Sequence, residues 1–313
     1  MLLLLFGFVL KDNLFFFLIY SSVAPLVYYC DYCRSSTSSM EKQLYLAVHD
    51  GDADKVLSLM STNPRLDVNW EDNHDNTPLH QASSGGHVEV VKALLTHPDI
   101  RANQKSLSGH APFSHSCLYG NVPVVRALLK DPRVDITLTD NHGWTPLWWA
   151  SFKGHQGVVE WLLASGRDLG DINSAKETPC DGKEYTALDI AKQSGHTEIA
   201  AVLEKFAANP EKTRRELRVK LGVLDELAAE IFALVIFLCD DQLQLKPALA
   251  TIDTSNSAAL SFFSIVRRLP MEMQMMLCRR VAGSVKDSIL SKDSEAAFKS
   301  LAGVLLHPSP RRR

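Results

Sequence analysis

The sequence has little net charge, few cysteines and no N-glycosylation acceptor. Its 33 Lys and Arg residues are balanced by 36 Asp and Glu residues, which gives a net charge of −3. Proteins that bind nucleic acid through their overall charge need a clear excess of Lys and Arg, so we expect no nucleic-acid partner. Six cysteines in 313 residues are too few for a disulfide scaffold. We therefore expect a reducing compartment, the cytoplasm.

No motif of a catalytic or cofactor site is present either. The chain has no Gly-rich phosphate loop, no His-Glu-x-x-His motif and no nucleophile elbow. Cys30 and Cys33 form a single Cys-x-x-Cys pair without a second half, and the histidines lack the short spacing of a zinc site. We therefore predict a protein that is not an enzyme, with no catalytic residue, cofactor, metal site or small-molecule substrate.

The N-terminal residues 1–29 are apolar but are interrupted by Lys11 and Asp12. A membrane-spanning helix needs about 20 mainly apolar residues, and a charge at its centre costs about 2.5–3.5 kcal/mol. Two interpretations stay open. In the first, the second half of the stretch is a signal anchor, and the protein is membrane-anchored. In the second, residues 1–39 are a leader that is absent from the working protein, which then starts at Met40. We favour the second.

Three copies of one pattern follow each other at a spacing of 34 residues. Each has a proline in its opening, a glycine nine residues after that opening begins, and paired Val and Leu residues beyond. The openings are Thr77-Pro78-Leu79-His80, Ala111-Pro112-Phe113-Ser114 and Thr145-Pro146-Leu147-Trp148. Two weaker copies of the pattern flank these three, and they begin near Leu44 and Thr186. The step from Thr145 to Thr186 is 41 residues, which predicts an insertion of about seven residues within 174–182.

The residue types in each copy favour a helix-turn-helix unit. Thr77 and Thr145 are good N-caps, and the proline after each suits the first helical position, where its missing N–H costs nothing. Ala111 lacks the capping hydroxyl, so we expect a weaker cap in that copy. We expect glycines with positive φ at the ends of the first helices, at Gly86, Gly120, Gly154 and Gly195. One copy cannot bury its apolar stripe alone, so the copies should stack.

This pattern resembles the ankyrin repeat family over about residues 41–206. The resemblance implies an all-α fold, an ankyrin-repeat solenoid of about five helix-turn-helix repeats, followed by a helical C-terminal region. The repeats are predicted at residues 41–70, 71–104, 105–138, 139–173 and 182–206. We expect the histidines at repeat positions to satisfy backbone groups between helices: His80, His87, His155 and His196.

Past Phe206 the period disappears, and a different helical region is predicted. Asn209-Pro210 is a helix start, and the uncharged run 231–239 that follows is far too short to span a membrane. We interpret this part as a buried helical cap on the open end of the stack. The predicted divisions are a cap at 207–250, a polar linker at 251–257, further helices at 258–306 and a disordered basic tail at 307–313.

The resemblance implies that partner proteins bind the concave face, which is lined by turn tips and first helices. Aromatic residues dominate such interfaces. Trp144 is the strongest candidate, because a tryptophan at a turn tip has no obvious core to fill. Trp148 and Trp149 fit either binding or packing within the stack. We expect Trp144, Tyr119 and Phe152 to form an exposed aromatic strip with a polar rim. The full predicted protein-binding set is Asn76, His110, Tyr119, Trp144, Phe152, Lys153 and Tyr185.

The predicted function is a non-enzymatic protein–protein interaction module or scaffold whose partner the sequence does not name. One alternative comes from Leu269-Pro270-Met271-Glu272, which looks like the opening of an F-box-like helix and implies a ubiquitin-ligase substrate adaptor. A simpler interpretation is that Pro270 starts a helix, Glu272 complements its dipole and the methionines pack in a core. A second alternative is a membrane-tethered scaffold, if residues 1–29 are retained.

Overall fold

A computed structural model describes most of the chain, in two compact units. The first unit takes in the chain up to Leu162 and Arg167–Glu204, and the second takes in Leu163–Gly166 and the chain from Lys205. The described residues are 39–177, 183–239, 262, 265–266, 268–284 and 289–306. The predicted leader up to residue 38, the linker at 251–257 and the tail at 307–313 lie outside them.

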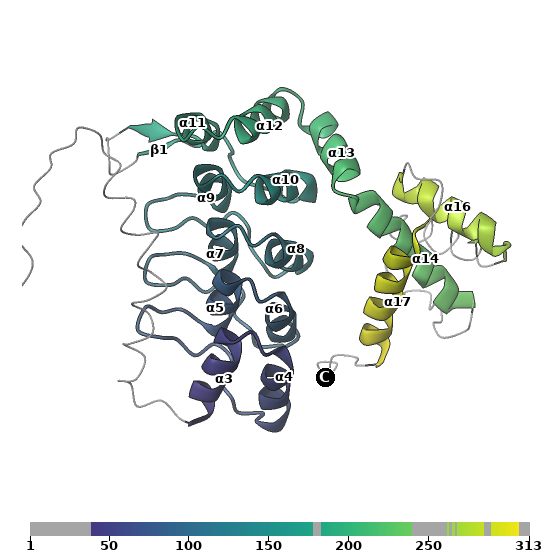
Figure 1. The fold of residues 1–313 in the computed structure, drawn as a ribbon, viewed down its shortest axis with the longest axis horizontal. Coiled ribbons are helices and arrows are strands. Elements are labelled where there is room, and N and C mark those ends of the chain that lie inside the picture. Colours follow the sequence, from purple (N-terminus) through teal and green to yellow (C-terminus); the bar gives the residue numbers. More distant parts are fainter. Residues whose placement is uncertain are drawn as a thin grey trace, which may run out of the picture. The chain divides into compact units, whose positions relative to one another are not determined.

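The repeats form a stack of helix pairs with an inner and an outer column (Figure 1). The inner helices are α3 (Ser39–His49), α5 (Pro78–Gly85), α7 (Pro112–Leu118), α9 (Pro146–Lys153) and α11 (Ala187–Gln193). The outer helices are α4 (Ala53–Thr62), α6 (Val88–Leu95), α8 (Val122–Lys130), α10 (Gln156–Ser165) and α12 (Thr197–Ala208). Each inner helix packs on the next. The predicted all-α solenoid of helix-turn-helix repeats is confirmed.

The inner helices start where the caps predict. Thr145 Oγ1 accepts a hydrogen bond of 3.2 Å from the backbone N–H of Trp148, and Thr186 Oγ1 accepts one of 3.1 Å from Asp189. The side chain of Ala111 cannot accept one, and α7 has no side-chain cap. The cap of the third copy is therefore weaker, as its sequence predicts.

Histidines tie neighbouring repeats together through backbone carbonyls. The Nε2 atom of His80 lies 3.0 Å from the carbonyl oxygen of His110, and that of His155 lies 3.0 Å from that of Leu118. His196 repeats the contact at 3.1 Å from Phe152. The predicted structural role is thus confirmed for these three histidines.

Gly120 shows why the closing position requires glycine. Its φ is +73°, in the left-handed region that disfavours a side chain, and an added Cβ would lie 2.5 Å from Nδ1 of His155. The predicted positive φ is found at all four closing glycines, which are Gly86, Gly120, Gly154 and Gly195. The glycine and the histidine of the next repeat therefore work as a pair.

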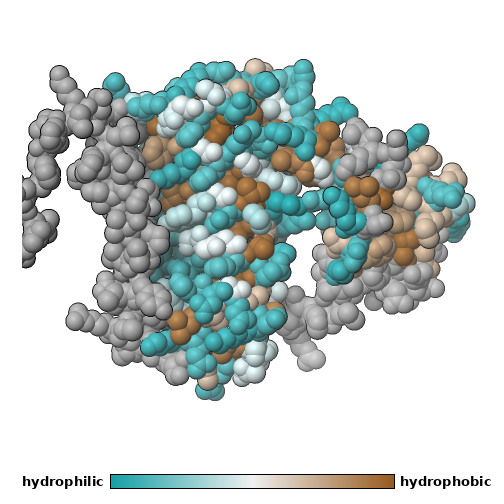
Figure 2. Space-filling model, viewed as in Figure 1, coloured by the Kyte–Doolittle hydropathy of each residue, from teal (hydrophilic) through white to brown (hydrophobic). Residues whose placement is uncertain are grey.

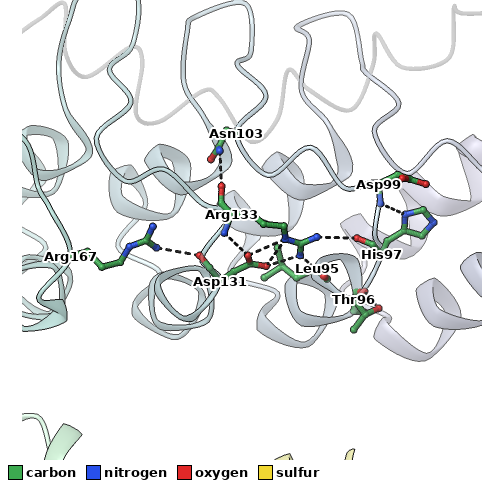
Figure 3. Close-up of polar contacts among 9 residues, drawn as sticks. Leu95, Thr96, His97, Asp99, Asn103, Asp131, Arg133 and Arg167 are labelled. Carbon is green, nitrogen blue, oxygen red and sulfur yellow. Dashed lines mark hydrogen bonds and ion pairs between the residues drawn. The ribbon is translucent and has the colours of Figure 1, made fainter. Parts of the chain in front are cut away.

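On the outer side, arginines bind the C-terminal carbonyls of the preceding repeat (Figure 3). The Arg133 guanidinium donates to the carbonyl oxygen of Leu95, the last residue of α6, at 2.6 Å, and to that of His97, at 3.3 Å. Asp131 holds it with an ion pair of 2.7 Å. Arg167 likewise donates to the carbonyl oxygen of Leu129 in α8. The last carbonyls of an α-helix lack hydrogen-bond donors within the helix, and these arginines provide donors for them.

The apolar stripes of the repeats form one continuous core. The outer helices contribute the same positions each time, and these side chains are fully or almost fully buried: Val90, Val91, Leu94, Val124, Val125, Leu128, Val158, Val159 and Leu162. In the view of Figure 2, hydrophilic residues cover much of the surface of the stack, with apolar patches between them.

The two described strands lie at the insertion predicted within 174–182, the first inside it and the second just after it. Strand β1 (Lys176–Glu177) pairs antiparallel with β2 (Glu184–Tyr185), with Lys176 opposite Tyr185. The strands lie on either side of residues 178–182, which are outside the described part. The inserted chain therefore returns on itself before α11 begins.

The second unit is helical, and its centre is α14. The unit contains α13 (Pro210–Lys220), α14 (Val223–Cys239), α16 (Met271–Ala282) and α17 (Ser291–Leu306). Phe232 and Val235 of α14 pack with Cys278 of α16, and Ala233 packs with Ala297 of α17.

This packing groups α14 with the helices after the predicted linker. The division into a cap at 207–250 and separate helices at 258–306 does not match this shared core. Of the two cysteines in these helices, Cys278 is buried and Cys239 is exposed. A role for this unit as a cap on the repeat stack stays a prediction. No described helix combines the length and apolarity that crossing a membrane requires.

The buried stripe makes a first prediction. Leu128 is fully buried in α8, so Leu128→Ala should lower the free energy of unfolding by about 2–5 kcal/mol, through lost burial and a cavity. Leu57 of α4 is 44% exposed and is the matched control, with an expected loss under about 1 kcal/mol on truncation to Ala. Urea unfolding followed by circular dichroism measures both. Equal losses would contradict a core that is continuous through α8.

Candidate protein-binding face

The central inner helices carry almost no charge. Helices α5, α7 and α9 read PLHQASSG, PFSHSCL and PLWWASFK, with no Asp or Glu and with Lys153 as their one Lys or Arg. We define the inner face as the half-buried and exposed side chains on α7 and α9 and directly after α7: His115, Leu118, Tyr119, Trp149, Phe152 and Lys153. This face is aromatic and apolar, with one cation.

A chain of ring contacts crosses the inner face from one repeat to the next. The Tyr119 ring centroid lies 6.2 Å from that of His115, which lies 5.5 Å from that of His110. His110 lies 5.4 Å from Trp149, and Trp149 lies 6.1 Å from Phe152. Tyr119 is 51% exposed. The structure therefore connects two of the predicted site residues, Tyr119 and Phe152, through the half-buried rings of His115 and Trp149 and the buried ring of His110.

Trp144 does not stand exposed at its turn tip, and that expectation is wrong. Its exposed fraction is 7%, and its ring stacks on Trp148 at 4.5 Å with an interplanar angle of 8°. Trp149 meets it edge-on, and Ile190 of α11 belongs to the same buried cluster. The reason is that the chain turns back into α9, which brings the ring at position 144 against the ring four residues later. Trp144 therefore packs beneath the inner face.

Asp140 organises this turn, and sequence reasoning missed it. Its Oδ1 accepts hydrogen bonds from the backbone N–H groups of His142, at 2.9 Å, and Trp144, at 3.0 Å. Its Oδ2 accepts one of 2.9 Å from the indole N–H of Trp149. This buried carboxylate thus fixes both the turn and the orientation of a ring on the inner face. Asp72 makes the same turn in the second repeat, so an Asp four residues before the tip positions of the second and fourth repeats was the available signal.

The predicted polar rim is only partly present. His110 is buried, contrary to its expected place on the rim. Asn76 is half-buried and donates to Asp72 through its backbone N–H and its amide. Tyr185 is half-buried and packs on the Trp144 cluster from β2. Leu107, which sequence reasoning also missed, is 64% exposed at the tip of the third repeat.

The histidines near the inner face are held neutral. Burial lowers the pKa of His80 to about 4, and hydrogen bonding to the backbone only partly offsets this effect. Burial and the neighbouring histidines hold the pKa of His115 well below its usual value. Burial also lowers the pKa of His110, against the opposite effect of Asp140. These rings therefore act as apolar or hydrogen-bonding groups at neutral pH.

No metal chemistry is indicated in the part of the chain that the structure describes. Within it, no group of three or more His, Cys, Asp or Glu side chains is placed to hold a metal ion. The buried thiol of Cys117 has a pKa raised by desolvation, so it is a poor nucleophile. The arrangement is suited to contact with another surface.

The burial of Trp144 makes a second prediction. Trp144→Ala should lower the free energy of unfolding by about 3–5 kcal/mol, because it removes a buried ring from a stacked cluster. Tyr119→Ala is the matched control and should cost much less, since half of that side chain is already exposed. Urea unfolding of both variants measures this. A Trp144 variant as stable as the native chain would contradict the packed role.

The neutral histidines make a third prediction, on pH. A histidine whose folded pKa lies below the unfolded value near 6.5 takes up its proton mainly on unfolding, so stability is full above pH 6.5 and falls as pH decreases towards 4. For each such histidine, the free energy of unfolding should fall by about 2 kcal/mol between pH 7.5 and pH 5. Unfolding free energies at the two pH values test this. His115→Gln should show a smaller drop, and an unchanged drop would contradict a neutral His115.

Comparison with known proteins identifies the family. A family model described as ankyrin repeats (3 copies) matches residues 29–106, 98–174 and 138–214, which together span more than half of the chain. No curated protein matches the chain. Ankyrin repeats are protein–protein interaction modules, and the family is generally non-enzymatic. The chain belongs to the ankyrin repeat family.

Proposed function

We propose that this protein is a non-enzymatic scaffold that binds a partner protein on the inner face of its third and fourth repeats. The single observation that supports this most is the row of ring contacts from Tyr119 to Phe152, in which Tyr119 is exposed and Trp149 and Phe152 are half-buried. Aromatic side chains provide large contact areas with few rotatable bonds, so they are enriched at the centres of interfaces.

The row is also held in place before any partner arrives. The Trp149 indole donates to the buried Asp140, and Phe152 stacks on Trp148 at 5.4 Å. Side chains that are already fixed lose little conformational freedom on binding, which favours affinity. Trp144 and His110 then act beneath the face as supports.

The remaining predicted residues take places around this centre. Tyr119, Phe152 and Lys153 are proposed to contact the partner directly. Tyr185, at the β2 side of the Trp144 cluster, is proposed as one border. Asn76, in the turn before α5, and the exposed Leu107 are proposed as peripheral contacts.

One observation favours the adaptor alternative as a second candidate function. The simpler interpretation expected the methionines of α16 to pack in a core. Two of them do not, because Met271 is 62% exposed and Met276 is 39% exposed. Helix α16 begins at Met271, directly after Pro270. The F-box-like helix would thus present apolar side chains to a second partner while Cys278 faces its own core.

The proposed function makes a fourth prediction. In the full chain, Tyr119→Ala and Phe152→Ala together should lower the affinity for the partner at least about tenfold, because central aromatic anchors carry much of the binding energy. Affinity purification with quantitative mass spectrometry from the native cell measures this, with Leu57→Ala on α4 as the control. The expected result is one set of proteins lost with the double variant and kept with the control.

Two other outcomes decide between the alternatives. A protein set unchanged in the double variant, with the fold intact by circular dichroism, would overturn the inner face as the binding site. Ubiquitin-ligase subunits that stay bound to the double variant would support the adaptor function through the second unit.

A further inference from the structure

The charge of the inner face points to the kind of partner segment that it accepts. We propose that the partner offers an acidic peptide segment, in which a carboxylate pairs with Lys153 and a nearby apolar side chain packs on Tyr119 and Phe152. This inference rests on the proposed function and names the partner chemistry of the same site.

The first observation is the absence of acidic residues around the cation. Helices α5, α7 and α9 contain no Asp or Glu, and residues 100–130 contain none either. The nearest acidic side chain by sequence, Glu160 of the outer helix α10, is buried and accepts a hydrogen bond from Gln156. Asp140 is also buried, and it accepts two hydrogen bonds from its own turn and one from the Trp149 indole. The inner face itself therefore offers Lys153 no carboxylate.

The second observation is that Lys153 is partly removed from water. Its side chain is half-buried at the end of α9, and its Nζ lies 5.2 Å from the centre of the Phe152 ring. Burial lowers the pKa of this ammonium group. It forms no ion pair with any described residue. A partly desolvated cation without an anion is unfavourable, and a carboxylate from a partner would relieve that cost with a charge-assisted hydrogen bond.

The groups that face Lys153 from neighbouring elements do not supply an anion. His155 lies beyond Gly154 in the same repeat, and its pKa is lowered by burial and by the lysine charge. His196 of the next repeat bonds to the carbonyl of Phe152. Neither imidazole can carry a negative charge, so neither supplies Lys153 with an anion.

The repeat geometry sets the spacing within the segment. Tyr119 and Lys153 occupy the same repeat position, each directly before the glycine that closes an inner helix. Packed helices lie about 8–10 Å apart, so the apolar and cationic positions are separated by about one such step. A segment that uses both should carry its carboxylate and its apolar side chain at one fixed spacing of about 10 Å.

The fifth prediction tests this with a defined probe. A random twelve-residue peptide library displayed on phage is selected against the full chain. The enriched peptides should share an Asp or Glu at a fixed distance from a Leu, Met or Phe. Their affinity should fall at least about tenfold with Lys153→Gln, fall further with Lys153→Glu, and change less than about threefold with Lys153→Arg, since arginine keeps the charge.

Lys92→Gln is the matched control, because Lys92 is exposed on α6 and paired with Glu89. It should leave peptide affinity unchanged. Peptides that weaken with Tyr119→Ala but show no acidic residue, or ignore Lys153→Gln, overturn this inference and leave the proposed function standing. Peptides that ignore both Tyr119→Ala and Phe152→Ala overturn the proposed function. A library with no enriched peptide overturns recognition of a segment.

Discussion

No repeat of this protein can bury its own apolar stripe, and the repeat fold depends on that constraint. Val124, Val125 and Leu128 of α8 are wholly buried only because neighbouring helix pairs cover them. Polar contacts then fix how the pairs align. A histidine binds a carbonyl of the preceding repeat on the inner side, as His155 does with Leu118, and an arginine does so on the outer side, as Arg133 does with Leu95. Burial drives stacking, and these contacts set its register.

The same alignment creates the inner face. Side chains at equivalent positions of successive inner helices come to lie side by side, so Tyr119 and Lys153 become neighbours in the repeat lattice although they are 34 residues apart. Near the centre of the stack these positions hold aromatic rings and neutral histidines where surface residues are usually charged. The buried carboxylate of Asp140 supports this face, because it orients Trp149 and closes the turn below it. A rigid aromatic surface with one cation is the result.

The second unit follows another organisation. Its central helix, α14, is apolar on more than one side, and it needs partners on each: Phe232 and Val235 pack towards α16, whereas Ala233 packs towards α17. The small side chain of alanine lets a helix approach closely, and the larger rings and branched chains fill the wider contact. The helices of this unit do not repeat, so each of these contacts is made once among the residues that the structure describes.

Local chemistry in the sequence determined the repeats. The threonine caps, the closing glycines and the 34-residue spacing act within one turn of helix or recur exactly in register, so no distant contact was needed to locate them. Distant contacts decided the site. Trp144 looked exposed because its tip has no core of its own, yet Trp148 and Ile190 of the next repeat enclose it. Likewise the division that separated α14 from the later helices missed the core that α14 shares with Cys278 and Ala297. Whether a side chain is buried depends on the residues packed around it, and only the tertiary structure brings residues of different repeats and helices together.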